Sequence, residues 1–199
     1  MSDVLEQVRA STVAKAEEII ELRRAVVREC RDRLAACAAD MASRFTAGGR
    51  LLAFGNGGSA TDAQQMATMF LEPGGDAHPL PALSLASDPS VLTALANDVG
   101  VDVVFARQIA ALGHPADIAV GLSTSGNSPN LVRALDEAAG RGMLTIGIAG
   151  YSGGKMSELA SLAYLFVAPS ASVHRIQEAQ TTMYQALWEL CQAALGAAS

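Results

Sequence analysis

The chain contains 199 residues, of which 50% are hydrophobic and 17% are charged, and its net charge is −6 at pH 7. This length favours a single domain, and the hydrophobic content excludes a disordered, solvated chain. The acidic balance excludes direct nucleic-acid binding, which needs a dense surface of Lys and Arg.

The sequence also lacks the features that mark exported and membrane-bound proteins. No apolar run approaches the roughly 20 residues that span a bilayer, and the first residues contain no apolar segment typical of a signal peptide. The three cysteines, Cys30, Cys37 and Cys191, show no C-x-x-C spacing and are interpreted as buried thiols. We expect a cytoplasmic protein without a membrane partner.

The N-terminal quarter of the chain is predicted to be helical. Residues 3–47 contain no Gly or Pro and place apolar side chains at roughly helical spacing. We interpret this segment as a helical hairpin, or as one long kinked helix, that ends at Gly48 and Gly49. Because the apolar surface is large for one domain, residues 1–48 are expected to take part in oligomerisation.

From residue 49 onwards, short apolar runs alternate with helical patterns. The apolar runs predict five strands, at residues 50–54, 81–86, 117–122, 143–150 and 162–167. The helical patterns cover residues 59–71, 89–112 with a break near 97–100, 129–139, 154–159 and 173–195. This alternation predicts βαβ units and a parallel sheet with both faces covered. The predicted fold is a flavodoxin-like three-layer α/β/α domain with a five-stranded parallel sheet over residues 49–199, preceded by the helical hairpin.

Two loops that follow predicted strands have the composition of a binding site, and ligands of such sheets bind beyond the carboxyl ends of the strands. The first loop, residues 55–59, contains three glycines that permit close backbone approach, and its Ser59 is expected to cap the next helix or to contact a ligand. The second loop, residues 123–128, places four hydroxyls at a predicted helix N-terminus, where backbone N–H groups and the helix dipole attract anions. We therefore predict that the second loop binds a phosphate monoester.

Each loop has an alternative interpretation. The second could be a polar turn with one capping Ser, although a cap does not need four hydroxyls. In the first, the pattern Gly55-x-Gly57-x-x-Ala60 fits a dinucleotide fingerprint. That fingerprint needs an acidic residue about 20 positions further on, and the nearest candidate, Asp88, lies beyond that distance. A Walker loop is excluded because no Gly-Lys-Ser/Thr follows.

Four segments together resemble the SIS (sugar isomerase) domain family and, within it, the sedoheptulose 7-phosphate isomerase (phosphoheptose isomerase) branch: GNGGSATDAQQ, LTALANDVG, GLSTSGNSPN and HRIQE. The resemblance covers essentially the whole chain and implies a homotetramer with active sites between subunits. It implies that the phosphate of a sugar phosphate is bound by Ser123, Thr124, Ser125 and Ser128. It also implies that the sugar is contacted by Asn56, Gly57, Ser59 and Asp98.

The residues that this family uses for isomerisation are replaced in this chain. The reaction moves a proton between C1 and C2 of a ketose, and it requires a general base and a general acid. The family's Glu and His for these roles fall at Met69 and Gln185. A His that binds zinc in some members falls at Gln65, whereas the zinc-binding Gln is kept as Gln177. Amide and thioether groups do not exchange protons near neutral pH and are poor zinc ligands, so we predict no metal and no other cofactor.

A relocated acid/base pair is one way in which activity could be kept. The candidates are His174 together with Glu178 or Glu72, which lie near the family segments. The alternative is that His174 caps the last helix and Glu178 forms a structural ion pair with an Arg. His78 and His114 lie in Pro-containing loops without ligand-spaced partners, so both are expected at the surface.

Two classes of function therefore remain open. We expect a phosphosugar-binding or regulatory protein, and the alternative is an active aldose–ketose isomerase that uses a relocated pair such as His174 with a Glu. A second alternative is a tetrameric adaptor. The segments VLTALAND and ALGHPADIAVGLST also resemble a member of the branch that binds the replication initiator DnaA and lacks the same Glu and His.

Overall fold

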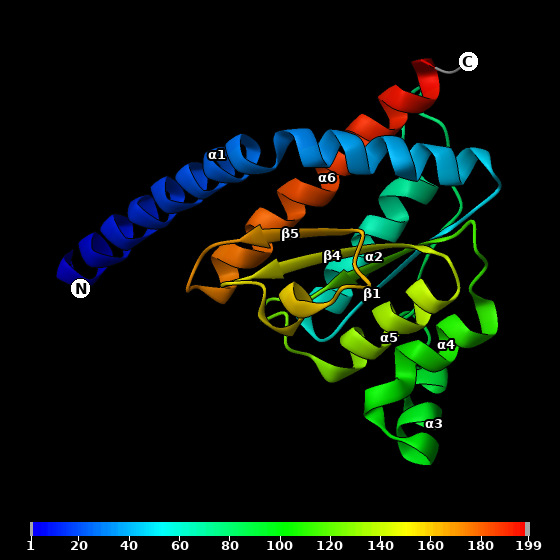
Figure 1. Ribbon diagram of the computed structural model, residues 1–199. Coiled ribbons are helices and arrows are strands. Elements are labelled where there is room, and N and C mark those ends of the chain that lie inside the picture. Colours follow the sequence, from blue (N-terminus) through cyan, green and yellow to red (C-terminus); the bar gives the residue numbers. More distant parts are fainter. Residues whose placement is uncertain (1, 198–199) are drawn as a thin grey trace.

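A single parallel sheet forms the centre of the protein, as the computed structural model of residues 2–197 shows (Figure 1). Its strands lie in the order β2-β1-β3-β4-β5, which is the flavodoxin-like order. The strands are β1 (Leu51–Gly55), β2 (Ala82–Ser84), β3 (Ile118–Leu122), β4 (Leu144–Gly150) and β5 (Tyr164–Ala168). The predicted five-stranded parallel sheet and three-layer fold are therefore confirmed.

Helices cover both faces of the sheet. The long helices are α1 (Ser2–Thr46), α2 (Gly58–Leu71), α3 (Pro89–Val99), α4 (Val104–Leu112), α5 (Pro129–Gly140) and α6 (Val173–Ala197). Two short 3-10 helices are η1 (Val101–Val103) and η2 (Gly154–Glu158). Helices α1, α2 and α6 build one core with the sheet, and α4 and α5 build the core on the opposite face, with α3 beside them (Figure 1).

The predicted N-terminal hairpin is wrong, because Ser2–Thr46 is one helix of 45 residues. It bends along its course in Figure 1, in agreement with the alternative of one long kinked helix. Without Gly or Pro, the segment contains no residue that would reverse the chain. Exposed ion pairs one turn apart, such as Glu6 with Arg9 and Glu21 with Arg24, favour an uninterrupted helix.

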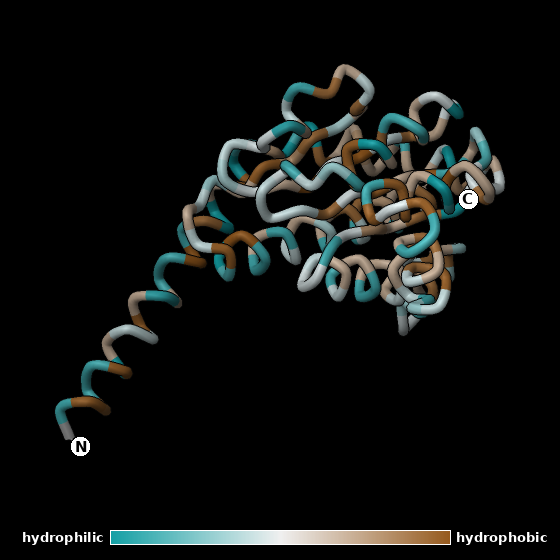
Figure 2. The backbone as a smooth tube through the Cα atoms, turned by 90° about the horizontal axis from the view of Figure 1, so that it is seen from below, coloured by the Kyte–Doolittle hydropathy of each residue, from teal (hydrophilic) through white to brown (hydrophobic). Residues whose placement is uncertain are grey.

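α1 packs on the body of the protein mainly through its second half. The buried apolar residues of this half recur at helical spacing and face α6 and the sheet: Leu34, Cys37, Ala38, Met41, Ala42 and Phe45. Arg33 lies with its guanidinium 5.8 Å from the ring centre of Phe166, and Asp40 accepts a 2.7 Å hydrogen bond from Tyr164. In the first half of α1, Ile19 and Leu22 are half-buried against the core. The carbonyl of Lys15 accepts a 2.9 Å hydrogen bond from Arg175. The rest of the first half extends beyond the body as an arm (Figure 2).

The amino ends of β1 and β3 are joined by a buried carboxylate. Asp117 accepts hydrogen bonds from the backbone N–H of Arg50 at 2.8 Å and from its guanidinium at 2.9 Å. Burial alone would raise the pKa of Asp117, but these bonds, the charge of Arg50 and the N–H of His114 together lower it. This interaction therefore joins β1 and β3 at their amino ends, opposite the end of the sheet where the two loops lie.

The cysteines and the remaining histidines have structural surroundings. Cys37 and Cys191 are buried, as expected, whereas Cys30 is half-buried. His78 and His114 are exposed, which agrees with the prediction that they lie at the surface. Within residues 2–197, no helix combines the length and the apolar character needed to cross a bilayer.

Candidate functional site

The two predicted binding loops lie side by side at the topological switch point of the sheet. β1 and β3 are hydrogen-bonded neighbours, and the chain leaves them towards opposite edges of the sheet. The first loop follows β1 and the second follows β3, so both open at the carboxyl ends of adjacent strands. This end of the sheet is where doubly wound sheets bind ligands.

The second loop, residues 123–128, presents its hydroxyls at the start of α5. Ser128 is the N-cap residue of α5, but its side chain makes no capping hydrogen bond. The Ser123 Oγ accepts a 3.0 Å hydrogen bond from the N–H of Gly126 and lies 3.5 Å from the Ser128 Oγ. No serine of this loop forms a side-chain cap of α5, but the Ser125 Oγ, like that of Ser123, accepts a hydrogen bond from a backbone N–H of the loop, as in a polar turn.

Gly126 gives the second loop its shape. Its φ of +67° favours glycine, and a Cβ at this position would lie 2.0 Å from the carbonyl oxygen of Gly153. The loop is also bonded to η2, since the Asn127 side chain accepts a 3.0 Å hydrogen bond from the N–H of Lys155. The hydroxyls of the loop are thus carried on a backbone with little freedom.

A reciprocal amide pair joins the two loops. The Nδ2 of Asn56 donates to the Oδ1 of Asn130 at 2.9 Å, and the Nδ2 of Asn130 donates back to the Oδ1 of Asn56 at 2.9 Å. Asn56 was predicted from the sequence, whereas Asn130 was not. Its position directly after Pro129, at the start of a helix, was the only signal available.

Ser59 and Asp98 differ from their predicted surroundings. The N-cap of α2 is Gly57, with a φ of +55°, so Ser59 does not cap this helix and instead lies buried in its first turn. Asp98 is exposed near the end of α3, where it accepts a 2.9 Å hydrogen bond from Asn97. Among the described residues, Asp98 lines neither the apolar cavity beside the first loop nor a second cavity between α2 and α6.

That second cavity, of about 390 Å³, lies between the first turns of α2 and α6. Its lining contains Gly58, Thr61, Asp62, His174, Gln177, Glu178 and Thr181. Gly58 lies close to α6: a Cβ at this position would lie 2.3 Å from the amide nitrogen of Gln177, whose flexible side chain would have to move. Burial raises the pKa of Asp62, and the neighbouring Gln177 amide offsets this only in part. Asp62 was not among the predicted site residues, because its proximity to α6 arises only in the folded chain.

The predicted catalytic residues His174 and Glu178 both line this cavity. His174 is exposed, and Glu178 forms a 2.9 Å ion pair with Arg175, as the structural alternative expected. Glu72 is not brought to His174, because it follows the last turn of α2 and lines a separate cavity. A pair of His174 with Glu72 is therefore excluded within this subunit.

The four positions that correspond to the family's acid, base and zinc ligands carry no titratable group. Gln65 and Gln185 are exposed, and Met69 packs half-buried against the core. The remaining position, Gln177, lies against Gly58 in the cavity between α2 and α6. Three amides and a thioether do not fit zinc, which prefers His, Cys and carboxylate ligands. Within residues 2–197 no three His, Cys, Asp or Glu side chains form a group that could hold a metal.

A flavodoxin-like sheet with a hydroxyl-rich loop at its switch point places the protein in the doubly wound α/β class. The sequence profile of the SIS domain matches residues 16–150, and the chain belongs to this family. It is 40% identical to the phosphoheptose isomerase of Aquifex aeolicus over 176 residues, 88% of this chain and 91% of that protein. It is 38% identical to the phosphoheptose isomerase of Roseiflexus sp. over 184 residues, 92% of each chain.

The similarity extends to solved structures. The phosphoheptose isomerase from Neisseria gonorrhoeae superimposes with a TM-score of 0.84 at 33% identity, covering 94% of this chain and 99% of that chain. The chain is thus a SIS phosphosugar isomerase-like protein over nearly its whole length.

Proposed function

We propose that this protein binds a sugar phosphate between its two loops and lacks the proton-transfer residues usual in its family. In this proposal Ser123, Thr124, Ser125 and Ser128 bind the phosphate, and Asn56, Gly57, Ser59 and Gln177 contact the sugar. A contact of Asp98 with the sugar, which the resemblance implies, has no support from the cavities of one chain. The hydroxyls, the N–H groups of the loop and the N-terminus of α5 together suit a dianionic phosphate.

One observation supports the proposal: the hydroxyl loop 123–128 is present, whereas the positions that correspond to the family's acid and base hold Gln185 and Met69. Enolisation needs a group that takes a proton from one carbon and a group that returns it to the next. A thioether takes up no proton near neutral pH, and an amide neither gains nor loses one. With these replacements the protein still binds the sugar phosphate, but it cannot isomerise it by the family's usual proton transfer.

The first test is a proton NMR time course of sedoheptulose 7-phosphate with the protein in D2O. We expect saturation transfer to the sugar protons and no deuterium entry at the carbon atoms. Ser125→Ala removes one hydrogen bond to a charged phosphate, worth about 1.5–3 kcal/mol, so affinity should fall about 10- to 100-fold.

Ser43→Ala is the matched control, because Ser43 is an exposed serine on α1 far along the chain from both loops. Its affinity should equal that of the wild type. Deuterium incorporation at a rate proportional to protein concentration would show that the chain is an active isomerase and contradict the loss of turnover.

A second candidate function, aldose–ketose isomerisation, is supported by the cavity between α2 and α6. Asp62 and His174 both line it, and the raised pKa of Asp62 is a property common among catalytic carboxyls. In such a reaction one group removes the C1 proton of the ketose to form an enediol, and a proton returned to C2 gives the aldose. If the time course shows turnover, Asp62→Asn and His174→Gln should each abolish most of it.

The same proposal includes a homotetramer in which residues 1–48 form part of the interface. The apolar residues along the arm of α1 support this part, because they have no cover within one chain. Binding of a replication initiator remains a prediction from resemblance.

A further inference from the structure

An apolar cavity of about 280 Å³ opens directly beside the first loop. It lies between that loop, the start of α2, helix α3 and the segment that leads into α4. Apolar side chains supply most of its lining: Ala60, Leu92, Ala96, Val101, Val104 and Phe105. This composition is unexpected next to a sugar site, where hydroxyl groups need hydrogen-bond partners.

The polar side chains of the cavity are already in hydrogen bonds. Asn56 and Asn130 hold each other through the reciprocal amide pair. The Thr93 hydroxyl donates to the carbonyl of Pro89 at 2.7 Å. A polyol chain in this cavity would lose water from its hydroxyls and regain few hydrogen bonds, which disfavours binding.

Asn130 places the cavity next to the start of α5, where the predicted phosphate loop ends. This residue lines the cavity and is the second residue of α5, whose N-terminus carries the hydroxyl loop. A volume of about 280 Å³ is slightly below the range of about 300–1,000 Å³ for sites that hold a whole small ligand. The cavity is therefore suited to one part of a ligand whose phosphate is bound by the loop.

We propose that this cavity is a subsite for a compact apolar substituent, such as a short acyl or alkyl group, on a phosphate ester bound by the second loop. The inference rests on the proposed phosphate binding and extends it, because it defines a substrate class less polar than an unsubstituted heptose phosphate. Each methylene buried there would be removed from water and would contact Leu92, Val104 and Phe105.

The experiment is an NMR titration with methyl, ethyl, propyl and butyl phosphate, which share one charge and differ only in apolar length. We expect affinity to rise roughly fourfold for each added methylene, the factor that corresponds to about 0.8 kcal/mol per buried CH2. Ala96→Leu places a larger side chain in the cavity and should reduce this rise to below about twofold. Methyl phosphate itself should bind Ala96→Leu as it binds the wild type.

Ala94→Leu is the matched control, because Ala94 is exposed on the same helix and does not line the cavity. It should keep the wild-type rise, and thermal unfolding should show that both variants are folded. An equal affinity for all four esters, or the same rise in Ala96→Leu as in the wild type, would overturn the subsite.

The two proposals fail in different ways. If sedoheptulose 7-phosphate binds and the four alkyl phosphates bind with equal affinity, the subsite is refuted and phosphate binding stands. If neither sedoheptulose 7-phosphate nor any alkyl phosphate binds, both proposals are refuted.

Discussion

At the scale of single residues, the surroundings of the Asp62 carboxyl group destabilise its charged form. One of its oxygens is buried and has no hydrogen-bond partner among residues 2–197. Burial raises its pKa above the ordinary value of 3.8, so the folded protein binds this proton more tightly than the unfolded chain does. The contribution of Asp62 to stability is therefore greatest at low pH and declines as the pH rises through its folded pKa.

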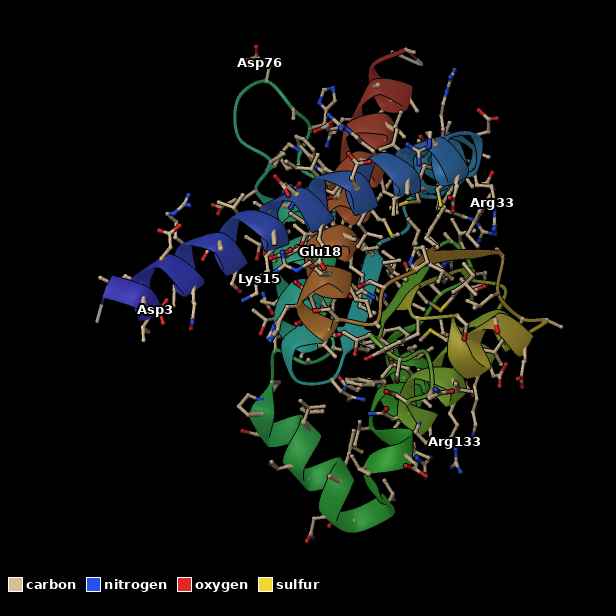
Figure 3. The ribbon with its side chains drawn as sticks, turned by 90° about the vertical axis from the view of Figure 1, so that its left-hand side faces the viewer. Asp3, Lys15, Glu18, Arg33, Asp76 and Arg133 are labelled. Carbon is tan, nitrogen blue, oxygen red and sulfur yellow. The ribbon has the colours of Figure 1, made fainter. Side chains whose placement is uncertain are left out.

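Asp62→Asn should consequently stabilise the protein at pH 7.5 by about 0.5–2 kcal/mol, the usual range of stabilising substitutions. At pH 3.5, where the wild-type carboxyl is mainly protonated in the folded state, the gain should be much smaller. Urea unfolding of the wild type and the variant at pH 7.5 and pH 3.5 measures this change in unfolding free energy. The control is Asp76→Asn, at the outer end of the loop after α2 (Figure 3), which should change stability at neither pH. An equal gain for Asp62→Asn at both pH values would argue against the raised pKa.

At the scale of elements, Gln180 of α6 connects a helix to the ends of two strands. Its Nε2 donates to the carbonyl of Ser123 at 3.1 Å and to that of Ile148 at 3.1 Å, and the residue is fully buried. Ser123 is the first residue of the hydroxyl loop, so the amide positions this loop without contacting the predicted ligand.

Gln180→Leu should cost about 1–3 kcal/mol of unfolding free energy, because it leaves the Ser123 carbonyl without this donor. Phosphate-ester affinity should fall as well, and Gln180→Glu should not restore it, since a carboxylate cannot donate. Gln64→Leu, at an exposed position of α2, is the control, and its unfolding free energy should remain within about 0.5 kcal/mol of the wild-type value. If affinity is unchanged while stability falls, Gln180 has a structural role only.

The sequence predicted most of the elements because their patterns are local. Each predicted strand agrees with the structure to within a few residues, since strands buried on both faces read as continuous apolar runs. The N-terminal hairpin was wrong because helical spacing shows which face is apolar but not how far the helix continues. Asn130 and Asp62 were missed for a different reason: their partners come from distant segments, and no local pattern reports such proximity.

At the scale of the whole molecule, the arm of α1 presents apolar side chains that the rest of the described chain does not cover. Leu5 is 66% exposed and Val8 58% exposed, and Ile20 also faces solvent within one chain. A single helix without tertiary contacts is marginally stable in water. Apolar positions along such a helix are instead typical of a face covered by a second copy.

We therefore expect Leu5→Lys, Val8→Lys and Ile20→Lys together to dissociate the assembly in light scattering coupled to size-exclusion chromatography. The control carries Gln7→Lys, Ala10→Lys and Ala14→Lys, which add the same charge on another side of the helix. The control should keep the wild-type mass. A wild-type protein that elutes as a monomer would refute the proposed homotetramer, and so would an unchanged mass for the first variant.

The pairing of α1 with α6 also has a consequence for how the chain is made. The core between α1, α6 and the sheet contains Leu34 and Met41 from α1 and Met183, Leu187 and Cys191 from α6. The core on the opposite face, under α4 and α5, has all its buried residues between Leu52 and Met156. Ribosomes synthesise about 5–20 residues per second, so α1 waits on the order of ten seconds for its partner. During synthesis the α4–α5 side can close first, while α1 exposes its apolar face until the last helix emerges. The nascent chain is therefore most vulnerable to aggregation and most dependent on chaperones before α6 has been synthesised.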